Sequence, residues 1–516
     1  MSLTSLAFIG ALALVFALYY TLPKKAQWPL LLLVSLGFYA SWGFYASAGR
    51  QGLWGLCYVA FTVLSAWLIA WRIAAMQGRQ KAHVAAHRTE LSREARKAYN
   101  AKQKRAQRRW LLLGLALNIG ILAATIILNS TGLKDALSVN IIVPIGISYY
   151  TFRIMGYLID VFWGKTQAQK NPAKLALFTI FFPQVWLGPI SRYDALSETL
   201  FSPHKFDWDA FQAGAQRIIL GYFKKLVIAD RLRLAMVELI PQAHGKSIPG
   251  LLSLSGAAAL FTMAVWAAEL YCDFTGGLDI AIGIGECFGI KMEENFLSPF
   301  RSKNIFEYWR RWHITMGTWF RDYVFYPISV AKPLQKFTGH LKSRGAKRRV
   351  PVYIATIVTW FVTGLWHGAA WNFIAWGLAN GVVILISQEL QPLYGKFHKR
   401  FPRMRGRAYD AFQVARTFLL MAFIRAFDIY ASVPLTFARF ASVFARPQLA
   451  ALAQAVQTLP WLDWLVAGLG ICLLFLGTRR LRKLPPAVWL LLVLAILVFG
   501  VYGLGYDAAA FIYTRF

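Results

Sequence analysis

Long apolar segments recur along this chain, and their length constrains the fold more than any other feature of the sequence. Each approaches the roughly 20 residues that a helix needs to cross a bilayer, and helices satisfy the backbone groups that lipid cannot. Five such segments lie near residues 3–22, 28–47, 53–76, 110–129 and 140–162. Three more lie near residues 412–430, 462–477 and 486–504. With the middle of the chain included, we predict an all-α polytopic integral membrane protein with about eleven transmembrane helices.

Between residues 176 and 380 the apolar segments become short and are interrupted by Gly, Pro and charged residues. The clearest examples are "FFPQVWLGPISRY", "YCDFTGGLDIAIGIGE", "YWRRWHITMGTWFRDYVFYP" and "GLWHGAAWNF". Irregular polar backbone is tolerated at membrane depth only where protein buries it or where it lines a cavity. We therefore expect re-entrant or in-plane helices in this region, around a central polar cavity.

The charge of the chain also fits a membrane protein. Only 15% of the residues are charged, and the net charge of +33 comes from basic blocks between apolar segments, as in cytoplasmic loops. The largest block, residues 77–109, holds eleven Lys or Arg and two Glu. We expect it to be a solvated cytoplasmic loop that contacts anionic lipid, with docking of an acidic acyl carrier protein as a second interpretation. Both chain termini are then outside, and nucleic acid is not an expected partner.

One histidine lies inside an apolar run, "GLWHGAAWNFIAWG", residues 364–377. An ionisable side chain in lipid costs a few kcal/mol, so His367 needs a reason to be there. In the middle of an apolar helix it is either a hydrogen-bonded core histidine or a group that handles protons and faces a cavity. Asn372 is the other strongly polar side chain nearby, and we favour the second interpretation.

A second histidine, His313, lies in "EYWRRWHITMGTWFRDYVFYP". Its apolar neighbours recur at helical spacing among charged residues, which predicts one amphipathic helix at a membrane face or cavity wall. An interfacial helix with an aromatic belt is the simpler interpretation of this segment. The residues that make up the pattern are Trp309, Trp312, Met316 and Trp319, with Arg310, Arg311, Arg321 and Asp322.

Two carboxylates, Asp273 and Asp279, flank a Gly-Gly pair in "YCDFTGGLDIAIGIGE". We expect a helix break at the glycines. The carboxylates either relay protons or cap the broken helices and pair with an arginine such as Arg310 or Arg192.

Several kinds of site are not indicated by the sequence. The four cysteines show no ligand spacing, and no histidine pair has the spacing of a helical metal site, so we expect no metal. No Walker loop, no GxGxxG after a strand and no GxSxG motif is present, so we expect no bound cofactor and no classical nucleotide-binding loop to hold the donor.

Four segments together resemble the signature blocks of a known family. In order and spacing, "FFPQVWLGPISRY", "YCDFTGGLDIAIGIGECFGIKMEENF", "EYWRRWHITMGTWFRDYVFYP" and "GLWHGAAWNFIAWGLANG" resemble those of the membrane-bound O-acyltransferase family. The bacterial branch, typified by the alginate O-acetyltransferase membrane subunit and the D-alanyl transfer protein, is the most similar. The resemblance implies one domain over residues 1–516, with N-terminal spans in 1–165, a catalytic core in 176–380 and C-terminal spans and tail in 410–516.

The resemblance also implies roles for the two histidines. His367 corresponds to the catalytic histidine of the family and His313 to its second polar position, in a funnel that opens to the cytoplasm. The acyl donor would be acetyl-CoA or an acyl carrier protein thioester, and the acceptor an extracytoplasmic polysaccharide outside the bacterial inner membrane. Arg310 and Arg311 would then hold the donor phosphates. The remaining residues expected to line the cavity are Asp273, Asn372 and Trp366.

The C-terminal residues, "FIYTRF", resemble the F-x-Y-F-x-F tail of bacterial systems that acylate polysaccharides. That resemblance implies that Tyr513 carries the acyl group to an extracytoplasmic SGNH-type partner protein. An aromatic anchor in the headgroups is the simpler interpretation.

Two alternative functions stay open at this point. Within the enzyme class, the chain would transfer D-alanyl or another acyl group from a carrier protein. In another class, a proton-coupled transporter or flippase would use the buried His and Asp as a proton relay. The polar interruptions lie in one central block rather than in paired repeats, which favours the enzyme.

Overall fold

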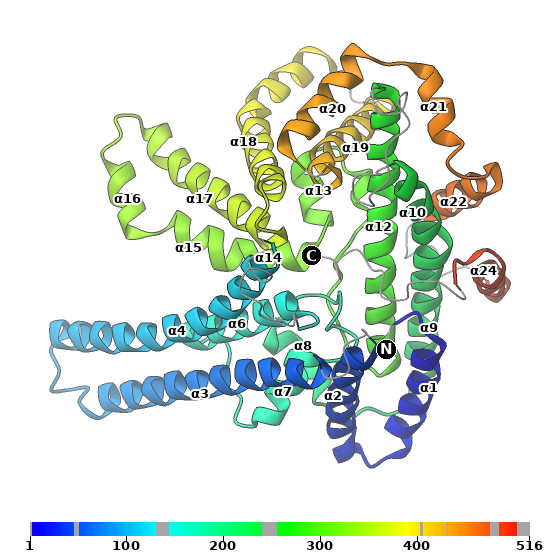
Figure 1. Cartoon of the computed structure of the whole chain (residues 1–516). Helices are drawn as coiled ribbons and strands as arrows, with labels where there is room; N and C mark the ends of the chain where they lie inside the picture. Colours follow the sequence, from blue (N-terminus) through cyan, green and yellow to red (C-terminus); the bar gives the residue numbers. More distant parts are fainter. Residues whose placement is uncertain are drawn as a thin grey trace. The chain divides into compact units, whose positions relative to one another are not determined.

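The computed structural model describes residues 3–45, 51–130, 144–239, 255–402, 406–430, 432–474 and 485–502, and every regular element in them is helical (Figure 1). The C-terminal tail with Tyr513 lies outside the described residues. By internal contacts the chain divides into unit 1, Met1–Ala215 with Ala281–Glu293, and unit 2, Gln216–Ile280 with Glu294–Phe516. The single domain that we expected over residues 1–516 stays a prediction.

Unit 1 contains the N-terminal helices. Two long helices, α3 (Gln51–Ala86) and α4 (Arg93–Ser130), form an antiparallel pair. The other elements are α1 (Leu6–Thr21), η1 (Lys24–Ala26), α2 (Gln27–Tyr45), α6 (Ile147–Trp163), α7 (Pro172–Ile180), α8 (Tyr193–Leu200) and most of α9 (Trp208–Tyr222).

The basic segment 77–109 is not the loop that we expected. Helix α3 continues to Ala86 and α4 begins at Arg93, so six residues connect two helices that run side by side in Figure 1. Ala, Gln, Lys and Arg are good helix formers, which explains why the helices extend beyond their apolar parts. Side chains then join the two helices, because Gln80 donates to Asn100 over 2.7 Å and Gln107 donates to Gln80 over 2.8 Å.

Unit 2 contains the histidines and most of the buried charges. Its first elements are the end of α9, the π-helical segment η2 (Phe223–Ala229), α10 (Asp230–Leu239) and most of α12 (Gly256–Cys287). Next come η4 (Pro299–Arg301), α13 (Ile305–Arg311), α14 (Ile314–Phe320), η5 (Arg321–Phe325), α15 (Tyr326–Ser329) and α16 (Lys332–Gly339). The last elements are α17 (Arg344–His367), α18 (Trp371–Arg400), α19 (Arg407–Ile429), α20 (Val433–Ala445), α21 (Leu449–Val456), α22 (Trp461–Leu474) and α24 (Pro486–Phe499).

The glycines of "GLWHGAAWNFIAWG" allow α17 and α18 to cross closely. A Cβ on Gly364 would lie 2.5 Å from the carbonyl oxygen of Phe373, and one on Gly377 would lie 2.3 Å from that of Trp360. Neither distance leaves room for a side chain, so the two backbones meet at the glycines, as small residues allow in membrane helices. This crossing fixes the end of α17, where His367 lies.

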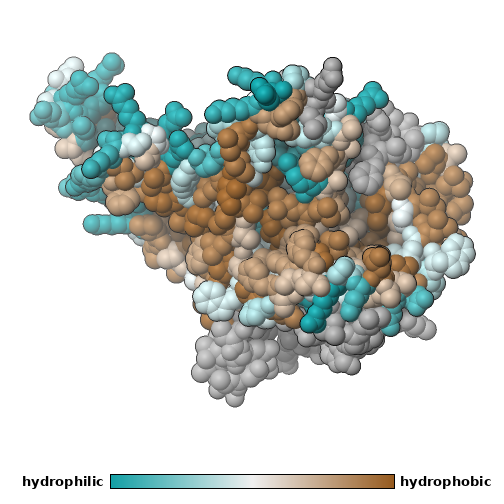
Figure 2. Space-filling view, turned by 90° about the horizontal axis from the view of Figure 1, so that it is seen from above, coloured by the Kyte–Doolittle hydropathy of each residue, from teal (hydrophilic) through white to brown (hydrophobic). Residues whose placement is uncertain are grey.

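Five helices in the described part of the chain are long and apolar enough to cross a membrane, or six if the bent pair α21 and α22 is one span. The five apolar stretches are Gly55–Ala86, Arg93–Ile127, Gly256–Cys287, Arg344–His367 and Trp371–Arg400. Apolar residues, brown in Figure 2, cover much of the face shown there. The described part of the chain is therefore all-helical, and its long apolar helices are those of a multi-pass membrane protein.

Candidate functional site

The segment around His313 is broken, not continuous. Helix α13 ends at Arg311 and α14 begins at Ile314, so the single amphipathic helix that we predicted is wrong. His313 is the N-cap residue that precedes α14; its φ of 46° lies in the left-handed region, and its side chain is fully buried. A non-glycine residue is uncommon there, and such strained residues often mark functional sites.

Asn295 explains why the chain turns at this histidine. Its side-chain oxygen accepts hydrogen bonds from the backbone N–H of Thr315 over 3.0 Å and from the Thr315 hydroxyl over 2.9 Å. The same oxygen lies 3.2 Å from Nδ1 of His313. Asn295 thus satisfies polar groups at the start of α14 and contacts the imidazole. We did not identify this residue from the sequence.

His367 is the last residue of α17, so our placement in the middle of a helix is wrong. The helix ends there because Gly368 is extended and α18 begins only at Trp371. The His367 side chain is buried, with its ring centroid 4.7 Å from that of Trp366 and 4.6 Å from that of Trp376. The imidazole therefore lies between aromatic rings at a helix end.

Trp366 brings the two histidines together. Its ring centroid lies 6.2 Å from that of His313 and 4.7 Å from that of His367. His313 and His367 are more than 50 residues apart in sequence, and both belong to unit 2. The structure therefore gathers three residues that we selected from the sequence into one cluster, which we call the histidine cluster.

A buried ion pair on α19 completes the histidine cluster. Arg425 lies 3.0 Å from Asp428, and both side chains are buried. The Arg425 guanidinium lies 4.6 Å from the ring centroid of Trp312 and 5.2 Å from that of Trp376. Arg425 also interacts electrostatically with both histidines. We overlooked this pair, although an Arg and an Asp three residues apart in the apolar run "FLLMAFIRAFDIY" could have revealed it.

Three other polar residues that we predicted near the histidines lie outside the histidine cluster. The Asn372 side-chain N–H donates to the backbone oxygen of Phe427 over 3.0 Å, which joins α18 to α19. Arg310 is exposed, and Arg311 pairs with Glu307 on the same helix over 2.5 Å. The hydrogen bond of Asn372 therefore connects two helices. Both arginines lie at the end of α13, beside the helix break.

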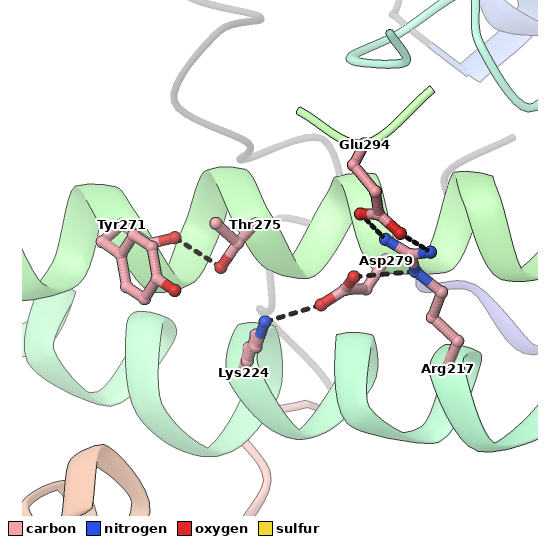
Figure 3. Close-up of polar contacts among 6 residues, drawn as sticks. All are labelled: Arg217, Lys224, Tyr271, Thr275, Asp279 and Glu294. Atoms are coloured by element: carbon pink, nitrogen blue, oxygen red, sulfur yellow. Dashed lines mark hydrogen bonds and ion pairs between the residues drawn. The ribbon is translucent and has the colours of Figure 1, made fainter. Parts of the chain in front are cut away.

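Helix α12 passes through the Gly-Gly pair without the break that we expected. Gly276, the first glycine of the pair, instead allows α12 to pack closely against α9. A Cβ on Gly276 would lie 2.9 Å from the backbone oxygen of Gly221, and one on Gly221 would lie 2.7 Å from that of Gly276. The end of α9 and α12 therefore approach each other backbone to backbone at these glycines. Figure 3 shows the two helices side by side.

This approach brings Asp279 to two cations of the neighbouring helix. One Asp279 oxygen lies 2.9 Å from Nε of Arg217 and the other lies 2.6 Å from Nζ of Lys224 (Figure 3). Arg217 also donates two hydrogen bonds to Glu294, over 2.7 and 2.6 Å. Asp279 thus pairs with an arginine, as one of our two interpretations expects, but the arginine is Arg217 and not Arg310 or Arg192.

Asp273 has a different partner on the same helix pair. Nζ of Lys225 lies 2.6 Å from Asp273 and 2.7 Å from Asp230, and all three side chains are buried. Together, the ion pairs of Asp273 and Asp279 form what we call the ion ladder between α9–η2 and α12. The doublet Lys224–Lys225 in the apolar run "LGYFKKLVIAD" is the sequence signal that we missed.

Unit 2 also contains a cavity. This cavity of about 280 Å³ is lined mainly by apolar side chains together with Tyr271, Cys272, Ser298 and Arg301. In the part of the chain that the structure describes, no three His, Cys, Asp or Glu side chains are grouped closely enough to hold a metal ion.

Comparison with known proteins identifies the family. The sequence model of the membrane-bound O-acyltransferase family matches residues 168–433, which include both histidines, Asn295 and Arg425. This chain belongs to the membrane-bound O-acyltransferase family. The match confirms the resemblance seen in the four sequence blocks.

Named relatives point to the same chemistry. The chain is 33% identical to a probable alginate O-acetylase of Azotobacter vinelandii, over 74% of this chain and 67% of that protein. It is 28% identical to a peptidoglycan O-acetyltransferase of Helicobacter pylori, over 60% of this chain and 61% of that protein. It is also 28% identical to a teichoic acid D-alanyltransferase of Bacillus subtilis, over 55% of this chain and 68% of that protein.

These relatives support an acyltransferase and not the transporter alternative. All three are named for acyl transfer, and the polymers in their names belong to the cell envelope or to exopolysaccharide. The chain spans 54% of the length of another relative, the probable alginate O-acetylase of Pseudomonas syringae.

Proposed function

We propose that this protein passes an acyl group, acetyl in the first instance, from a cytosolic thioester toward a hydroxyl of an extracytoplasmic polysaccharide. The observation that carries the proposal is the convergence of His313 and His367 on the Trp366 ring, within the region that matches the acyltransferase family. Imidazole is the side chain best suited to take up and return a proton near neutral pH.

His367 acts as the general base in this proposal. Its imidazole takes the proton of the attacking hydroxyl, and the hydroxyl oxygen forms a bond to the thioester carbonyl carbon. The carbon–sulfur bond then breaks, and the imidazolium returns the proton to the departing thiolate. The aromatic rings of Trp366 and Trp376 surround the base and keep water from competing with the acceptor.

The donor and the topology follow from the same proposal. Acetyl-CoA would enter from the cytoplasm through a polar funnel, with its phosphates held by Arg310 and Arg311 and with Asp273 near its path. The protein would be one domain in the bacterial inner membrane, with about eleven crossings and with both termini outside. The basic ends of α3 and α4 support this orientation, because cytoplasmic segments carry the excess of Lys and Arg.

Tyr513 would connect the membrane reaction to the polymer. A phenol ester is an activated acyl donor toward an aliphatic hydroxyl, so a tyrosine is a suitable carrier. The acyl group would pass from Tyr513 to a serine of an SGNH-type partner and from there to the polysaccharide. Support comes from the sequence of the tail, "FIYTRF", and from the relatives named for polysaccharide acetylation.

A second candidate is transfer of D-alanyl, or another acyl group, from an acidic carrier protein. Two observations favour it: the similarity to teichoic acid D-alanyltransferases, 28% and 30% identical, and the basic helical pair formed by residues 77–109. An acidic carrier protein would complement that charge.

Labelling of the purified protein distinguishes the two candidates. The protein in liposomes is incubated with radiolabelled acetyl-CoA or with a carrier protein loaded with labelled D-alanine. We expect the acetyl label to appear on the C-terminal peptide of the wild type and not on that of Tyr513→Phe, which keeps the aromatic ring. Label from the carrier protein alone would favour D-alanyl transfer, and equal acetyl labelling of Tyr513→Phe would exclude the tyrosine as carrier.

A further inference from the structure

The side-chain amide of Asn295 lies against the imidazole of His313. Asn295 is buried, and one of its two amide atoms faces both Nδ1 of His313 at 3.2 Å and the backbone nitrogen of Thr315 at 3.0 Å. The oxygen and nitrogen of an amide are usually assigned from their partners. A backbone N–H only donates, so the atom that faces Thr315 is the oxygen.

This assignment fixes the tautomer of the histidine. An amide oxygen only accepts hydrogen bonds, so Nδ1 of His313 is the nitrogen that carries the proton. In the neutral ring, Nε2 then holds the lone pair and accepts hydrogen bonds. The opposite tautomer would place two acceptors 3.2 Å apart at Asn295 in a buried site, which costs the free energy of an unsatisfied polar group.

We infer that Asn295 is a positioning residue for acyl transfer, which holds His313 as the Nδ1–H tautomer and leaves Nε2 as a hydrogen-bond acceptor in the histidine cluster. The inference rests on the proposed function. An attacking hydroxyl must donate its proton while its oxygen approaches the thioester, so acceptors that can orient it are useful in such a site. His367 takes the proton, and His313 provides a second acceptor near the same tryptophan.

The backbone around Asn295 is held from two sides. Its carbonyl oxygen accepts a hydrogen bond from the backbone N–H of Ile314 over 2.9 Å. Glu294, the preceding residue, accepts two hydrogen bonds from Arg217, which Asp279 holds from the other side (Figure 3). The ion ladder thus anchors the segment that orients His313, and this anchoring lets the left-handed backbone of His313 persist.

An asparagine suits this position better than an aspartate. Both offer an oxygen at the same place, but a carboxylate beside the ring would favour the charged imidazolium. A charged ring has no lone pair, so it can neither accept a hydrogen bond from a hydroxyl nor take its proton. The neutral amide orients the ring without charging it.

Nitrogen NMR of the detergent-solubilised full chain, with isotope-labelled histidine, tests the tautomer directly. His313→Gln assigns the signals by their loss. We expect the wild-type ring to show a protonated Nδ1 and a lone pair at Nε2, and Asn295→Asp to show both nitrogens protonated at neutral pH. A protonated Nε2 with a bare Nδ1 in the wild type, or an unchanged ring in Asn295→Asp, would overturn the inference.

A kinetic comparison separates positioning from structural support. We expect Asn295→Asp to lower kcat by roughly 10²-fold with KM within about threefold, and to recover activity as the pH rises. Asn304→Asp is the matched control, because Asn304 caps α13 through a 2.9 Å bond from the Glu307 N–H and should retain wild-type kcat. Wild-type kcat and pH profile in Asn295→Asp would contradict the inference. Because the NMR result does not depend on turnover, an inactive wild type would contradict the proposed function alone.

Discussion

The histidine cluster and the ion ladder are both buried in unit 2, but their ionisable side chains have different neighbours. In the ladder, Asp279 and Asp273 meet lysine or arginine nitrogens at 2.6 to 2.9 Å, so each carboxylate has a cation beside it. In the cluster, His313 and His367 lie against aromatic rings. Opposite charges that neutralise one another hold helices together, whereas imidazoles among apolar rings stay able to exchange protons.

This difference shows that the contacts of a buried ionisable residue, and not its burial alone, distinguish a structural role from a chemical one. Both the buried aspartates and the buried histidines suggested function from the sequence, because such residues are costly in lipid. In the structure the aspartates join α9–η2 to α12, and the histidines lie at the broken ends of helices. We therefore assign stability to the ion ladder and chemistry to the histidine cluster.

The largest effect on stability is expected from Asp279→Ala. Removing this carboxylate leaves Arg217 and Lys224 buried next to each other without their shared anion. We expect a loss of about 3–5 kcal/mol in the free energy of unfolding, seen as a lower thermal unfolding temperature and less protein in the membrane. The control is Asp322→Ala, which removes an exposed pair with Arg321 and should cost below about 1 kcal/mol. Equal stability of the two variants would contradict the structural role of the ladder.

A smaller effect is expected from Gly276→Ala. Its new Cβ would lie 2.9 Å from the backbone oxygen of Gly221, so α9 and α12 must separate slightly. We expect a loss of about 1–3 kcal/mol, measured by thermal unfolding. Gly468→Ala is the matched control, because its Cβ would meet no atom within 4 Å, and we expect it to be neutral or stabilising. If both alanines behave alike, close packing does not explain the Gly-Gly pair.

The histidine cluster should respond in turnover more than in stability. Arg425→Lys keeps the charge near Asp428 but loses the flat guanidinium that lies over Trp312 and Trp376. We expect kcat to fall about tenfold while the unfolding free energy changes by about 1 kcal/mol. Unchanged kcat together with a large loss of stability would show that Arg425 supports the fold and not the reaction.

The smallest effect is expected outside both clusters, at Arg310. If this exposed arginine holds a donor phosphate, Arg310→Ala should raise the KM for acetyl-CoA a few-fold and leave kcat nearly unchanged. Arg321→Ala, which removes another exposed arginine nearby in sequence, is the control and should keep the wild-type KM. The same KM in both variants would leave α13 without a role in donor binding.

The sequence predicted the long helices and several residues of the two clusters, but not the contacts between these residues. Hydropathy indicated the long apolar helices, and a histidine in an apolar run singled out His367. The sequence could not show that Asn295 would meet His313, or that Arg425 would lie over two tryptophans, because these contacts join segments far apart in the chain. The helical form of most of residues 77–109 was predictable from helix propensity, and we missed it because we interpreted the charge as a sign of a loop. The helix break at His313 could not be predicted from its own segment, because it depends on the side-chain oxygen of Asn295, which accepts from the Thr315 N–H.

The most direct test measures acyl transfer and thermal unfolding on the same His367→Ala preparation. If His367 is the base and the ion ladder holds the fold, the variant unfolds at the wild-type temperature and its acyl transfer falls by at least about 10²-fold. Asp279→Ala, measured alongside, should unfold at a lower temperature. A folded His367→Ala protein that transfers acyl groups at the wild-type rate would contradict the account.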